Sequence, residues 1–390
     1  MNIVIVIDLI DTLTNGSVMT ARRFADGLKS RGHGVKIVAV GADGKDDCPV
    51  REKYFPLLSE VSAKNQIKFA KFEKAKIKSA FEGADIVHFI FPFRFERQCK
   101  KLADKMNLPT TAAFHVQPEN ISYNVHLGRS KIFNRLIYTY LRKTFYSRFS
   151  RIHCPSNFIA DKLRVHGYGG ELYVISNGYD EAFRPSEESA KNERFEIVMV
   201  GRLAPEKNQK VLISAIAKSK HRDEIHLTLL GNGSCKTRLE RQAKKENVDV
   251  SFNFLPKEKL IKKLQQSDLY VHSATVEIEA IACIEAIACG LVPVISDSAL
   301  SATPQFALDN RSLFKDNDAT SLAEKIDYWF ENENERLRMG KVYADFADRF
   351  RLDKSLEQAE EMFSDQIYAS RTAEAFPLRG KWICPQGKDE

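Results

Sequence analysis

Short apolar runs rich in β-branched residues alternate with helical patterns along most of this chain, and this alternation restricts the fold more than any other feature. In the first half the runs are residues 3–7, 35–38, 86–90, 110–114 and 172–175. Runs of this kind between helical stretches predict parallel strands in a sheet that is covered on both faces. The expected fold class is therefore α/β.

The same alternation starts again after a polar stretch at residues 180–194, with runs at 197–200, 227–230, 250–254, 269–271 and 292–295. A chain of 390 residues also exceeds the size at which one hydrophobic core usually stops growing. We therefore predict two Rossmann-like, doubly wound domains, residues 1–186 and 187–350, that face each other across a cleft. A helix within residues 351–372 is expected to pack back on the first domain, followed by a disordered tail at 373–390.

Positive charge is concentrated in the first half of the chain. Residues 1–186 carry 29 Lys and Arg against 18 Asp and Glu, whereas residues 187–390 carry 30 against 34. This asymmetry predicts an anionic partner for the first domain, either nucleic acid or an anionic membrane surface. Two basic segments with interleaved aromatic residues, 64–81 and 129–151, predict amphipathic helices. Their basic residues include Lys68, Lys71, Lys74, Lys76, Lys78, Arg135, Arg142, Lys143 and Arg148.

No apolar run approaches the roughly 20 residues that a membrane-spanning helix needs. The apolar N-terminal run is interrupted by Asp8 and Asp11 and has no basic leader, so it predicts a first strand rather than a signal peptide. The protein is therefore expected in the cytoplasm.

Three strand-to-helix loops have the composition of an anion site. Gly16 precedes a predicted helix at 18–29, where backbone N–H groups can approach an anion; an ordinary capped helix is the alternative. Arg202 and Lys207 follow the first strand of the second domain and can bind a diphosphate; a solvated loop is the alternative. Gly231, Asn232 and Gly233 follow the next strand and can pass a backbone beside a nucleotide, although the spacing is not a dinucleotide fingerprint.

The segment from Val276 to Gly290 is the most informative. It predicts a helix that begins near Ala280 and ends at a glycine C-cap. Glu285 stands in this otherwise apolar helix, and a buried carboxylate is costly unless it has a partner. Glu277 lies just before the helix, where free N–H groups can hold phosphate. Two such carboxylates can bracket a ribose and a hexose through their hydroxyl groups.

In their order and spacing these motifs resemble the retaining GT-B glycosyltransferases of family 4, over nearly the whole chain. The strings at 15–21, 114–124, 152–156 and 301–308 are similar to the lipid glycosyltransferases of that family that act on cholesterol or ceramide. The resemblance implies that Glu277 binds the hexose, Glu285 the ribose, and that His115 lies beside the transferred sugar, with His115 and Glu277 as the catalytic residues. It implies a donor site built from Gly16, Arg202, Lys207, Gly231, Asn232, Gly233, Leu255, Glu279, Ala280, Ile281 and Glu285.

Within that donor site, Arg202 and Lys207 would hold the diphosphate, and the backbone at Ala280 and Ile281 a phosphate. The family often has an aromatic residue and a glycine where this chain has Glu279 and Ala280, which makes Glu279 a rival of Glu277 for the sugar.

The resemblance implies a metal-independent, α-retaining transfer of glucose or galactose from a UDP-sugar to a membrane lipid, which is a sterol, a ceramide or a diacylglycerol. No metal is expected, because His88, His153 and His272 fit no ligand spacing and Asp316-Asn317-Asp318 is better explained as a helix N-cap. Three alternatives stay open: transfer to a polysaccharide or protein, a non-catalytic sugar-binding protein, and a nucleic-acid-binding protein. With a lipid acceptor implied, the basic segments are expected to bind anionic headgroups at the inner face of the cell membrane.

Overall fold

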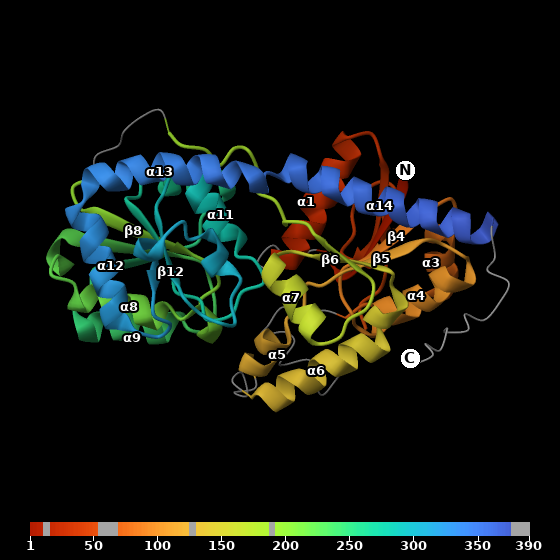
Figure 1. Cartoon of the computed structure of the whole chain (residues 1–390), viewed down its shortest axis with the longest axis horizontal. Helices are drawn as coiled ribbons and strands as arrows, with labels where there is room; N and C mark the ends of the chain where they lie inside the picture. Colours follow the sequence, from red (N-terminus) through yellow and green to blue (C-terminus); the bar gives the residue numbers. More distant parts are fainter. Residues whose placement is uncertain (11–15, 54–68, 125–129, 187–191, 376–390) are drawn as a thin grey trace, which may run out of the picture.

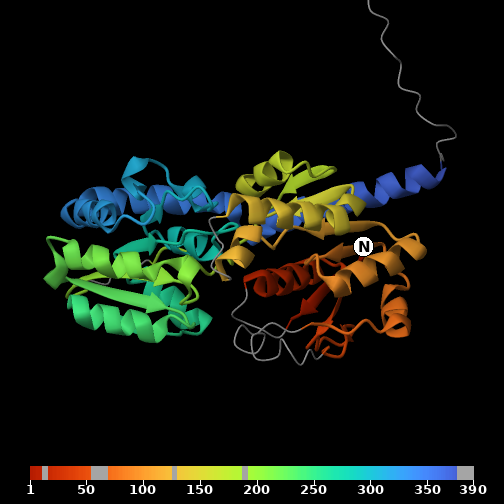
Figure 2. The ribbon, with the colours of Figure 1, turned by 90° about the horizontal axis from the view of Figure 1, so that it is seen from below.

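The computed structural model describes residues 1–10, 16–53, 69–124, 130–186 and 192–375, and it contains two parallel sheets with helices on both faces (Figures 1 and 2). The first sheet has seven strands in the order β3-β2-β1-β4-β5-β6-β7, and the second has six in the order β10-β9-β8-β11-β12-β13. Every strand pair is parallel, as the buried apolar runs predict.

The strands of the first sheet are β1 (Asn2–Leu9), β2 (Gly34–Val40), β3 (Cys48–Pro49), β4 (Ile86–Phe89), β5 (Thr110–Ala113), β6 (Arg151–Cys154) and β7 (Glu171–Val174). Those of the second sheet are β8 (Phe195–Val200), β9 (Ile225–Leu230), β10 (Val250–Asn253), β11 (Leu269–His272), β12 (Pro293–Ser296) and β13 (Leu313–Phe314). Each predicted run lies on one of these strands. The structure adds β3 and β13, which have only two residues each, and β6, in which Arg151 and His153 interrupt the apolar pattern.

The helices around the first sheet are α1 (Gly16–Ser30), α3 (Lys74–Phe81), α4 (Arg94–Lys105), α5 (Pro118–Asn124), α6 (Lys131–Thr144) and α7 (Asn157–Val165). Those around the second are α8 (Gln209–Lys218), α9 (Lys236–Glu246), α10 (Lys257–Gln265), α11 (Ile281–Ala288), α12 (Ala319–Glu331) and α13 (Glu333–Ala347). Short 3₁₀ turns are η1 (Tyr146–Arg148), η2 (Pro205–Lys207), η3 (Arg222–Glu224), η4 (Thr303–Phe306), η5 (Asn310–Ser312) and η6 (Asp348–Phe350). Within the described ranges, no helix has both the length and the hydropathy to cross a bilayer.

The long final helix α14 (Leu352–Ala375) lies against the first domain, although it follows the second in sequence (Figure 1). Its apolar face joins the core of the first domain, and Phe363 packs edge-on against His88 of β4 at 5.3 Å between ring centroids. Polar contacts fasten the same helix, since Ser150 and Tyr173 donate hydrogen bonds to Gln366 and Asp365. The core residues that α14 supplies are Leu356, Ala359, Met362, Phe363 and Ile367.

The chain crosses between the domains twice, and the two crossings are hydrogen-bonded side by side. The Tyr179 N–H donates to the Phe350 carbonyl at 3.1 Å, and the Leu352 N–H donates to the Tyr179 carbonyl at 3.0 Å. Gly178 makes this approach possible: its φ is +70°, and a Cβ there would lie 2.8 Å from the Cα of Leu352. The crossings therefore form one narrow connection between the two domains.

Candidate active site in the interdomain cleft

The loops that follow β8 and β11 bring a lysine and a glutamate together with the last residue of β11, a histidine, at the carboxyl end of the second sheet. Lys207, at the end of η2, forms an ion pair with Oε1 of Glu277. The same oxygen lies 3.1 Å from Nε2 of His272, the last residue of β11. Carboxyl ends of parallel strands are where doubly wound folds bind ligands, so we take this group as the centre of the candidate site.

Glu277 is held in its ionised form by these neighbours. Burial is the largest influence and raises its pKa, but the charge of Lys207 and the hydrogen bond from His272 outweigh burial and bring the pKa to about 2. Its backbone is fixed as well, because it pairs with Ser301 and its carbonyl accepts a hydrogen bond from the Ala302 N–H at 3.0 Å. Glu277 is therefore a rigidly placed carboxylate at neutral pH.

Arg202 is separate from this centre, although it stands on the same loop as Lys207. Its Nη2 lies 2.5 Å from Oε1 of Glu206, a buried residue of η2, while the Arg202 side chain as a whole is 46% exposed. The pairing with Glu206 orients the guanidinium and leaves most of its five N–H donors for another anion. The structure thus offers two cations on one loop, each tethered by its own carboxylate.

Packing within the protein is enough to explain why the 231–233 loop has glycines at both ends. A Cβ on Gly231 would lie 2.0 Å from the Gly201 carbonyl oxygen, and one on Gly233 would lie 2.3 Å from that of Leu203. The Asn232 carbonyl accepts the Leu203 N–H at 2.9 Å, which locks this loop to the loop that carries Arg202. Leu255, after β10, is partly buried against the core of the second domain. The 231–233 loop thus holds the Arg202 loop in place. That this loop and Leu255 contact the nucleotide stays a prediction.

Helix α11 begins at Ile281, as the sequence predicts, and Ala280 is its N-cap with φ +72°. This left-handed backbone normally favours glycine, so Ala280 adopts the shape that an aromatic-glycine pair would provide, at a cost of about 1 kcal/mol. The first-turn amides of Ile281 and Ala282 have no acceptor within the helix. The helix ends before Gly290, with φ +86°, which confirms the glycine C-cap.

Glu285 is buried on α11 and is paired across the cleft. Arg23 of α1 approaches its Oε1 at 2.7 Å, and the side chains are 21% and 8% exposed. Burial raises the pKa of Glu285, while the Arg23 guanidinium lowers it. Arg23 also donates to the Gly178 carbonyl at 3.2 Å. The partner that a buried carboxylate requires is thus an arginine of the other domain.

Glu279 points away from the Lys207 centre. Its Oε2 accepts the Asn177 N–H at 2.9 Å, beside the first crossing between the domains, and its side chain is buried. Burial raises its pKa to about 7, against hydrogen bonds from Ser176 and Asn177 that lower it. Of the two rivals for the sugar, Glu277 is the one that the structure places beside Lys207.

His115 lies in the loop after β5, on the opposite wall of the cleft. It is buried, and its ring packs edge-on against His153 at 5.4 Å, while His153 stacks on His88 at 6.1 Å. Burial lowers the pKa of all three imidazoles, so they are neutral. The loop reaches the second domain through Gln117, whose Nε2 donates to the Leu300 carbonyl at 2.9 Å, and α5 contacts η2.

The basic segments of the first domain differ from the prediction of two long amphipathic helices. Lys68 falls outside the described residues, and Lys71 lies before α3, where its N–H donates to the Arg51 carbonyl. The helix prediction for 64–81 is therefore wrong over residues 69–73, and only Lys74, Lys76 and Lys78 are on α3. In the second segment α6 ends at Thr144, and Arg148 lies on η1. Gly16 begins α1, and a Cβ on it would meet no heavy atom of the described residues within 4 Å.

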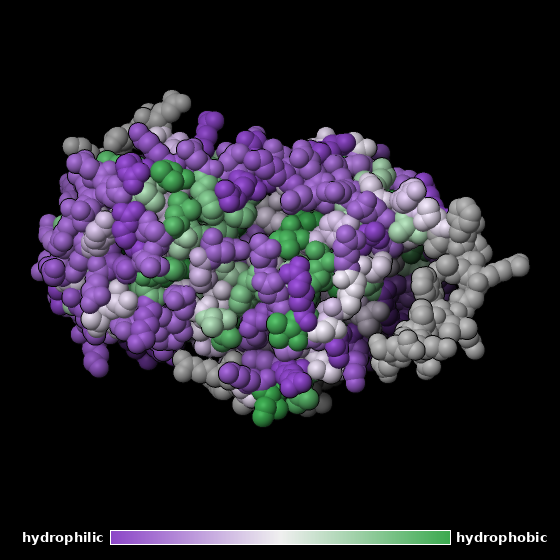
Figure 3. Space-filling view, viewed as in Figure 1, coloured by the Kyte–Doolittle hydropathy of each residue, from purple (hydrophilic) through white to green (hydrophobic). Residues whose placement is uncertain are grey.

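One face of α6 is exposed and apolar. Ile132, Leu136 and Tyr140 recur at helical spacing and are 77%, 62% and 53% exposed, with Lys143 in line and Arg135 beside them. The opposite face is anchored by Tyr138, whose hydroxyl donates to Glu119 at 3.0 Å and whose ring stacks on His166 at 3.9 Å. Figure 3 shows apolar side chains at the lower edge of the molecule, over this helix.

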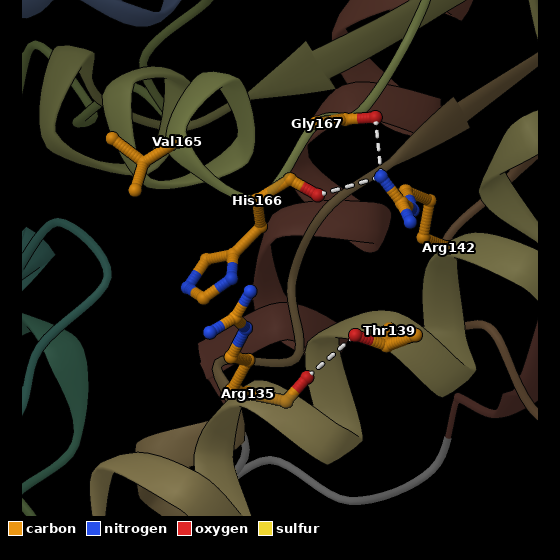
Figure 4. A pocket seen from close by; sticks show the side chains of 6 residues that line it. All are labelled: Arg135, Thr139, Arg142, Val165, His166 and Gly167. Carbon is orange, nitrogen blue, oxygen red and sulfur yellow. Dashed lines mark hydrogen bonds between the residues drawn. The ribbon is translucent and has the colours of Figure 1, made fainter.

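A cavity of about 500 Å³ lies between α6 and the end of α7 (Figure 4). Arg142 closes one side and is already engaged, since its Nη1 donates to the carbonyls of His166 and Gly167 at 3.0 and 2.9 Å. Arg135 lies under the His166 imidazole, and its guanidinium is open to the cavity (Figure 4). Arg135, not Arg142, is the basic residue here that is available to a ligand.

The histidine and the arginine that complete the two glutamate pairs were not predicted as site residues. His272 stands at a strand end, which is a signal, but a histidine at a strand end does not by itself indicate a hydrogen bond to a glutamate five residues later. Arg23 lies in an ordinary helical pattern far from Glu285 in sequence and gives no signal.

Asp318 caps α12 by accepting the Thr320 and Ser321 N–H groups at 3.0 Å, which confirms the N-cap prediction. In the described ranges no group of three or more His, Cys, Asp or Glu is arranged to hold a metal.

Two family models match the chain in succession. A model described as Glycosyltransferase Family 4 matches residues 14–183, and one described as Glycosyl transferases group 1 matches residues 180–344. The catalytic domain of cholesterol-alpha-glucosyltransferase from Helicobacter pylori is 50% identical over 40% of this chain and 99% of its own, with a TM-score of 0.38. A search of curated proteins found no match.

Other solved structures share the fold over nearly the whole chain. Sucrose-phosphate synthase from Thermosynechococcus elongatus is 16% identical over 95% of this chain and 100% of its own, with a TM-score of 0.76. Anabaena Alr3699/HepE in complex with UDP and glucose is 17% identical over 94% of this chain and 100% of its own, with a TM-score of 0.73.

Two Rossmann-like domains that face each other across a cleft, with the cations and carboxylates described above, define the GT-B class of glycosyltransferases. Within that class, the chain belongs to glycosyltransferase family 4, whose members retain the anomeric configuration of the sugar.

Proposed function

We propose that this glycosyltransferase moves glucose or galactose from a UDP-sugar to the hydroxyl of a membrane lipid, with retention and without a metal. The observation that carries the donor assignment is the pair formed by Lys207 and Glu277, with Glu285 further along the same cleft on α11. In such a pair the ammonium can bind the diphosphate of a nucleotide sugar, and the carboxylate can bind the hydroxyl groups of the hexose.

The hydrogen-bonding capacity of these side chains supports the assignment. A lysine ammonium has three N–H donors, so Lys207 can bind a phosphate oxygen while it stays paired with Glu277. Arg202 adds a planar fork that suits phosphate, and the open amides of α11 add the positive end of a helix. These cations would stabilise the departing UDP, which is the role that a metal ion has in other transferases.

On the sugar side, departure of UDP leaves oxocarbenium-like positive charge on the ring. The ionised Glu277 would bind hydroxyl groups of the hexose and hold the ring in place, and neutral His115 would orient it from the first domain. Glu285 would bind the ribose through the oxygen that Arg23 does not occupy. The proposal assigns no covalent nucleophile, so front-face and double displacement are both compatible with it.

The exposed face of α6 supports a lipid acceptor. Apolar side chains flanked by basic ones are typical of a helix that lies in the membrane interface, and each basic residue near an anionic surface contributes about 1 kcal/mol. The first domain also carries the excess of positive charge. The protein would thus bind the inner face of the cell membrane peripherally and take its acceptor there.

The enzymatic test combines UDP-glucose and UDP-galactose with vesicles that contain cholesterol, ceramide or diacylglycerol, with and without EDTA, and detects products by mass spectrometry. We expect one hexose to be added to at least one lipid, and the rate with EDTA to match the rate without it. Transfer to a polysaccharide or protein in the absence of any lipid product would contradict the acceptor, and loss of activity with EDTA would contradict the metal-independent mechanism.

The membrane test is co-sedimentation with vesicles of neutral or anionic phospholipid. Reversing the charge at Arg135 and Lys143 should weaken binding to anionic vesicles at least tenfold. The matched control reverses Lys244 and Lys245, two exposed residues of α9 in the second domain, and should bind like the wild type. Equal losses in both variants would show that net charge alone, rather than the α6 face, governs binding.

A further inference from the structure

A chain of hydrogen bonds runs from the core of the second domain to Glu277. The Tyr270 hydroxyl lies 3.0 Å from Nδ1 of His272, and Nε2 of His272 lies 3.1 Å from Oε1 of Glu277. Tyr270 and His272 are both buried on β11, and their rings stack at 6.0 Å between centroids, with 29° between the ring planes. In the site described above, His272 is only a hydrogen-bond donor to Glu277, and Tyr270 has no role there.

The direction of each hydrogen bond follows from chemistry. Glu277 is ionised and can only accept, so Nε2 of His272 must carry a proton. Burial lowers the pKa of His272, with Lys207 adding to this and Glu277 opposing it, so the imidazole is neutral and Nδ1 is its acceptor. Burial also keeps the pKa of Tyr270 well above its usual value, so the hydroxyl keeps its proton and donates it to Nδ1. One tautomer of His272 is thereby selected.

The arrangement also selects which oxygen of Glu277 is free. Lys207 and His272 both bind Oε1, and in the described part of the chain Oε2 has no hydrogen-bond partner. Because two donors from two different elements hold Oε1, the carboxylate cannot rotate without losing both. Oε2 is therefore presented to the cleft in a fixed direction.

We propose that His272 is a positioning residue of the transferase, which orients Glu277 toward the hexose, and that Tyr270 supports it by fixing its tautomer. This inference rests on the proposed role of Glu277 as the ligand of the transferred sugar. The alternative is that His272 only fills space at the end of β11. If His272 is a positioning residue, activity depends on its hydrogen bond to Glu277. If it only fills space, activity depends on the volume of the side chain at position 272.

The test compares His272→Gln, which keeps a side-chain N–H donor, with His272→Leu, which keeps the volume without a donor. We expect His272→Leu to lower kcat about 10- to 100-fold, because a hydrogen bond to a charged group is lost, with the donor KM changed less than about threefold. His272→Gln should recover most of kcat. Tyr270→Phe should lose less than His272→Leu, because the histidine can still donate in one of its two tautomers.

The pH dependence is a second measurement. The titratable groups around Glu277 in the described structure are Lys207 of η2, His272 and Tyr270 of β11, and the Cys283 thiol of α11. Losing the donor at 272 raises the pKa of Glu277, so the acid limb of the kcat profile of His272→Leu should move to higher pH. A residue that only fills space would leave this limb where it is.

The inference is overturned if folded His272→Leu keeps the wild-type kcat and acid limb, or if His272→Gln loses as much activity as His272→Leu. Failure of the proposed function is a different result, in which the wild type transfers from neither UDP-sugar. The ¹⁵N chemical shifts of His272 test the geometry without any substrate. They should show one neutral tautomer, protonated at Nε2, in the wild type and a mixture in Tyr270→Phe; a mixture in the wild type would contradict the proposal.

Discussion

Replacing Glu279 with glutamine should make the protein more stable at alkaline pH and nearly unchanged at acidic pH. Glu279 is 2% exposed, and burial raises its pKa from 4.5 to about 7, although Ser176 and Asn177 donate hydrogen bonds to it. The folded state therefore favours the protonated form. Glutamine has the same shape and keeps the carbonyl oxygen that accepts the Asn177 N–H, but it never ionises.

The size of the effect follows from the two pKa values. Below pH 4.5 the carboxyl is protonated in both folded and unfolded chains, so it adds no pH dependence. As the pH rises from 4.5 through 7, the unfolded chain loses its proton first, and the folded protein loses stability relative to it. At about 1.4 kcal/mol for each unit of pKa, the full loss is about 3 kcal/mol, of which about 2.5 falls between pH 5 and pH 8.5.

Urea unfolding of the wild type and of Glu279→Gln at pH 5 and pH 8.5 measures this difference. The variant should gain about 2 to 3 kcal/mol relative to the wild type between the two pH values. Glu277→Gln is the matched control, and its expected effect on the stability of the folded protein has the opposite sign. The pKa of Glu277 is lowered to about 2, so the ionised carboxylate stabilises the folded protein above pH 4.5, and the substitution removes that stabilisation. If the wild type and Glu279→Gln gave parallel stability curves, the assignment of a raised pKa to Glu279 would be refuted.

Three further predictions test the packing around the site. Arg23→Ala and Glu285→Ala should each destabilise the protein by about 2 kcal/mol, and the double variant should reveal a coupling of about 1 to 3 kcal/mol in thermal unfolding; additive effects would mean that the pair does not interact in solution. Ala280→Gly should relieve the left-handed backbone and raise the unfolding free energy by up to about 1 kcal/mol, and a loss of similar size would contradict the strain. Gly231→Ala should cost about 3 kcal/mol, because its Cβ would collide with the backbone of the neighbouring loop, whereas Gly169→Ala, with open space around it, should change stability by less than about 0.5 kcal/mol.

The sequence predicts the two sheets and the donor loops because both depend on local patterns. Buried parallel strands read as apolar runs, and the helix from Ile281 begins and ends where its cap residues indicate. Local patterns do not predict the partners of the two glutamates. Arg23 and Glu285 are 262 residues apart in sequence, and nothing in either segment refers to the other.

The basic segments show a second reason why prediction stops. Composition identifies a cationic stretch, but it does not say which cations are already used by the protein. Arg142 is bound to two backbone carbonyls, whereas Arg135 on the same helix is open to the cavity. Likewise, the sequence leaves Glu279 as a rival of Glu277, and only the fold turns one toward Lys207 and the other toward Asn177.

The two adjacent crossings at Tyr179 and Leu352 make the second domain an insertion within the first. The core of the first domain needs Leu356, Met362 and Phe363, which the ribosome synthesises after the whole of the second domain. Multidomain chains generally complete their N-terminal domain first during synthesis. Here the order is reversed: the second domain can close its sheet on the ribosome, while the first keeps an apolar groove uncovered until α14 emerges. Late synthesis of that one helix therefore sets the moment at which the cleft, and with it the active site, is complete.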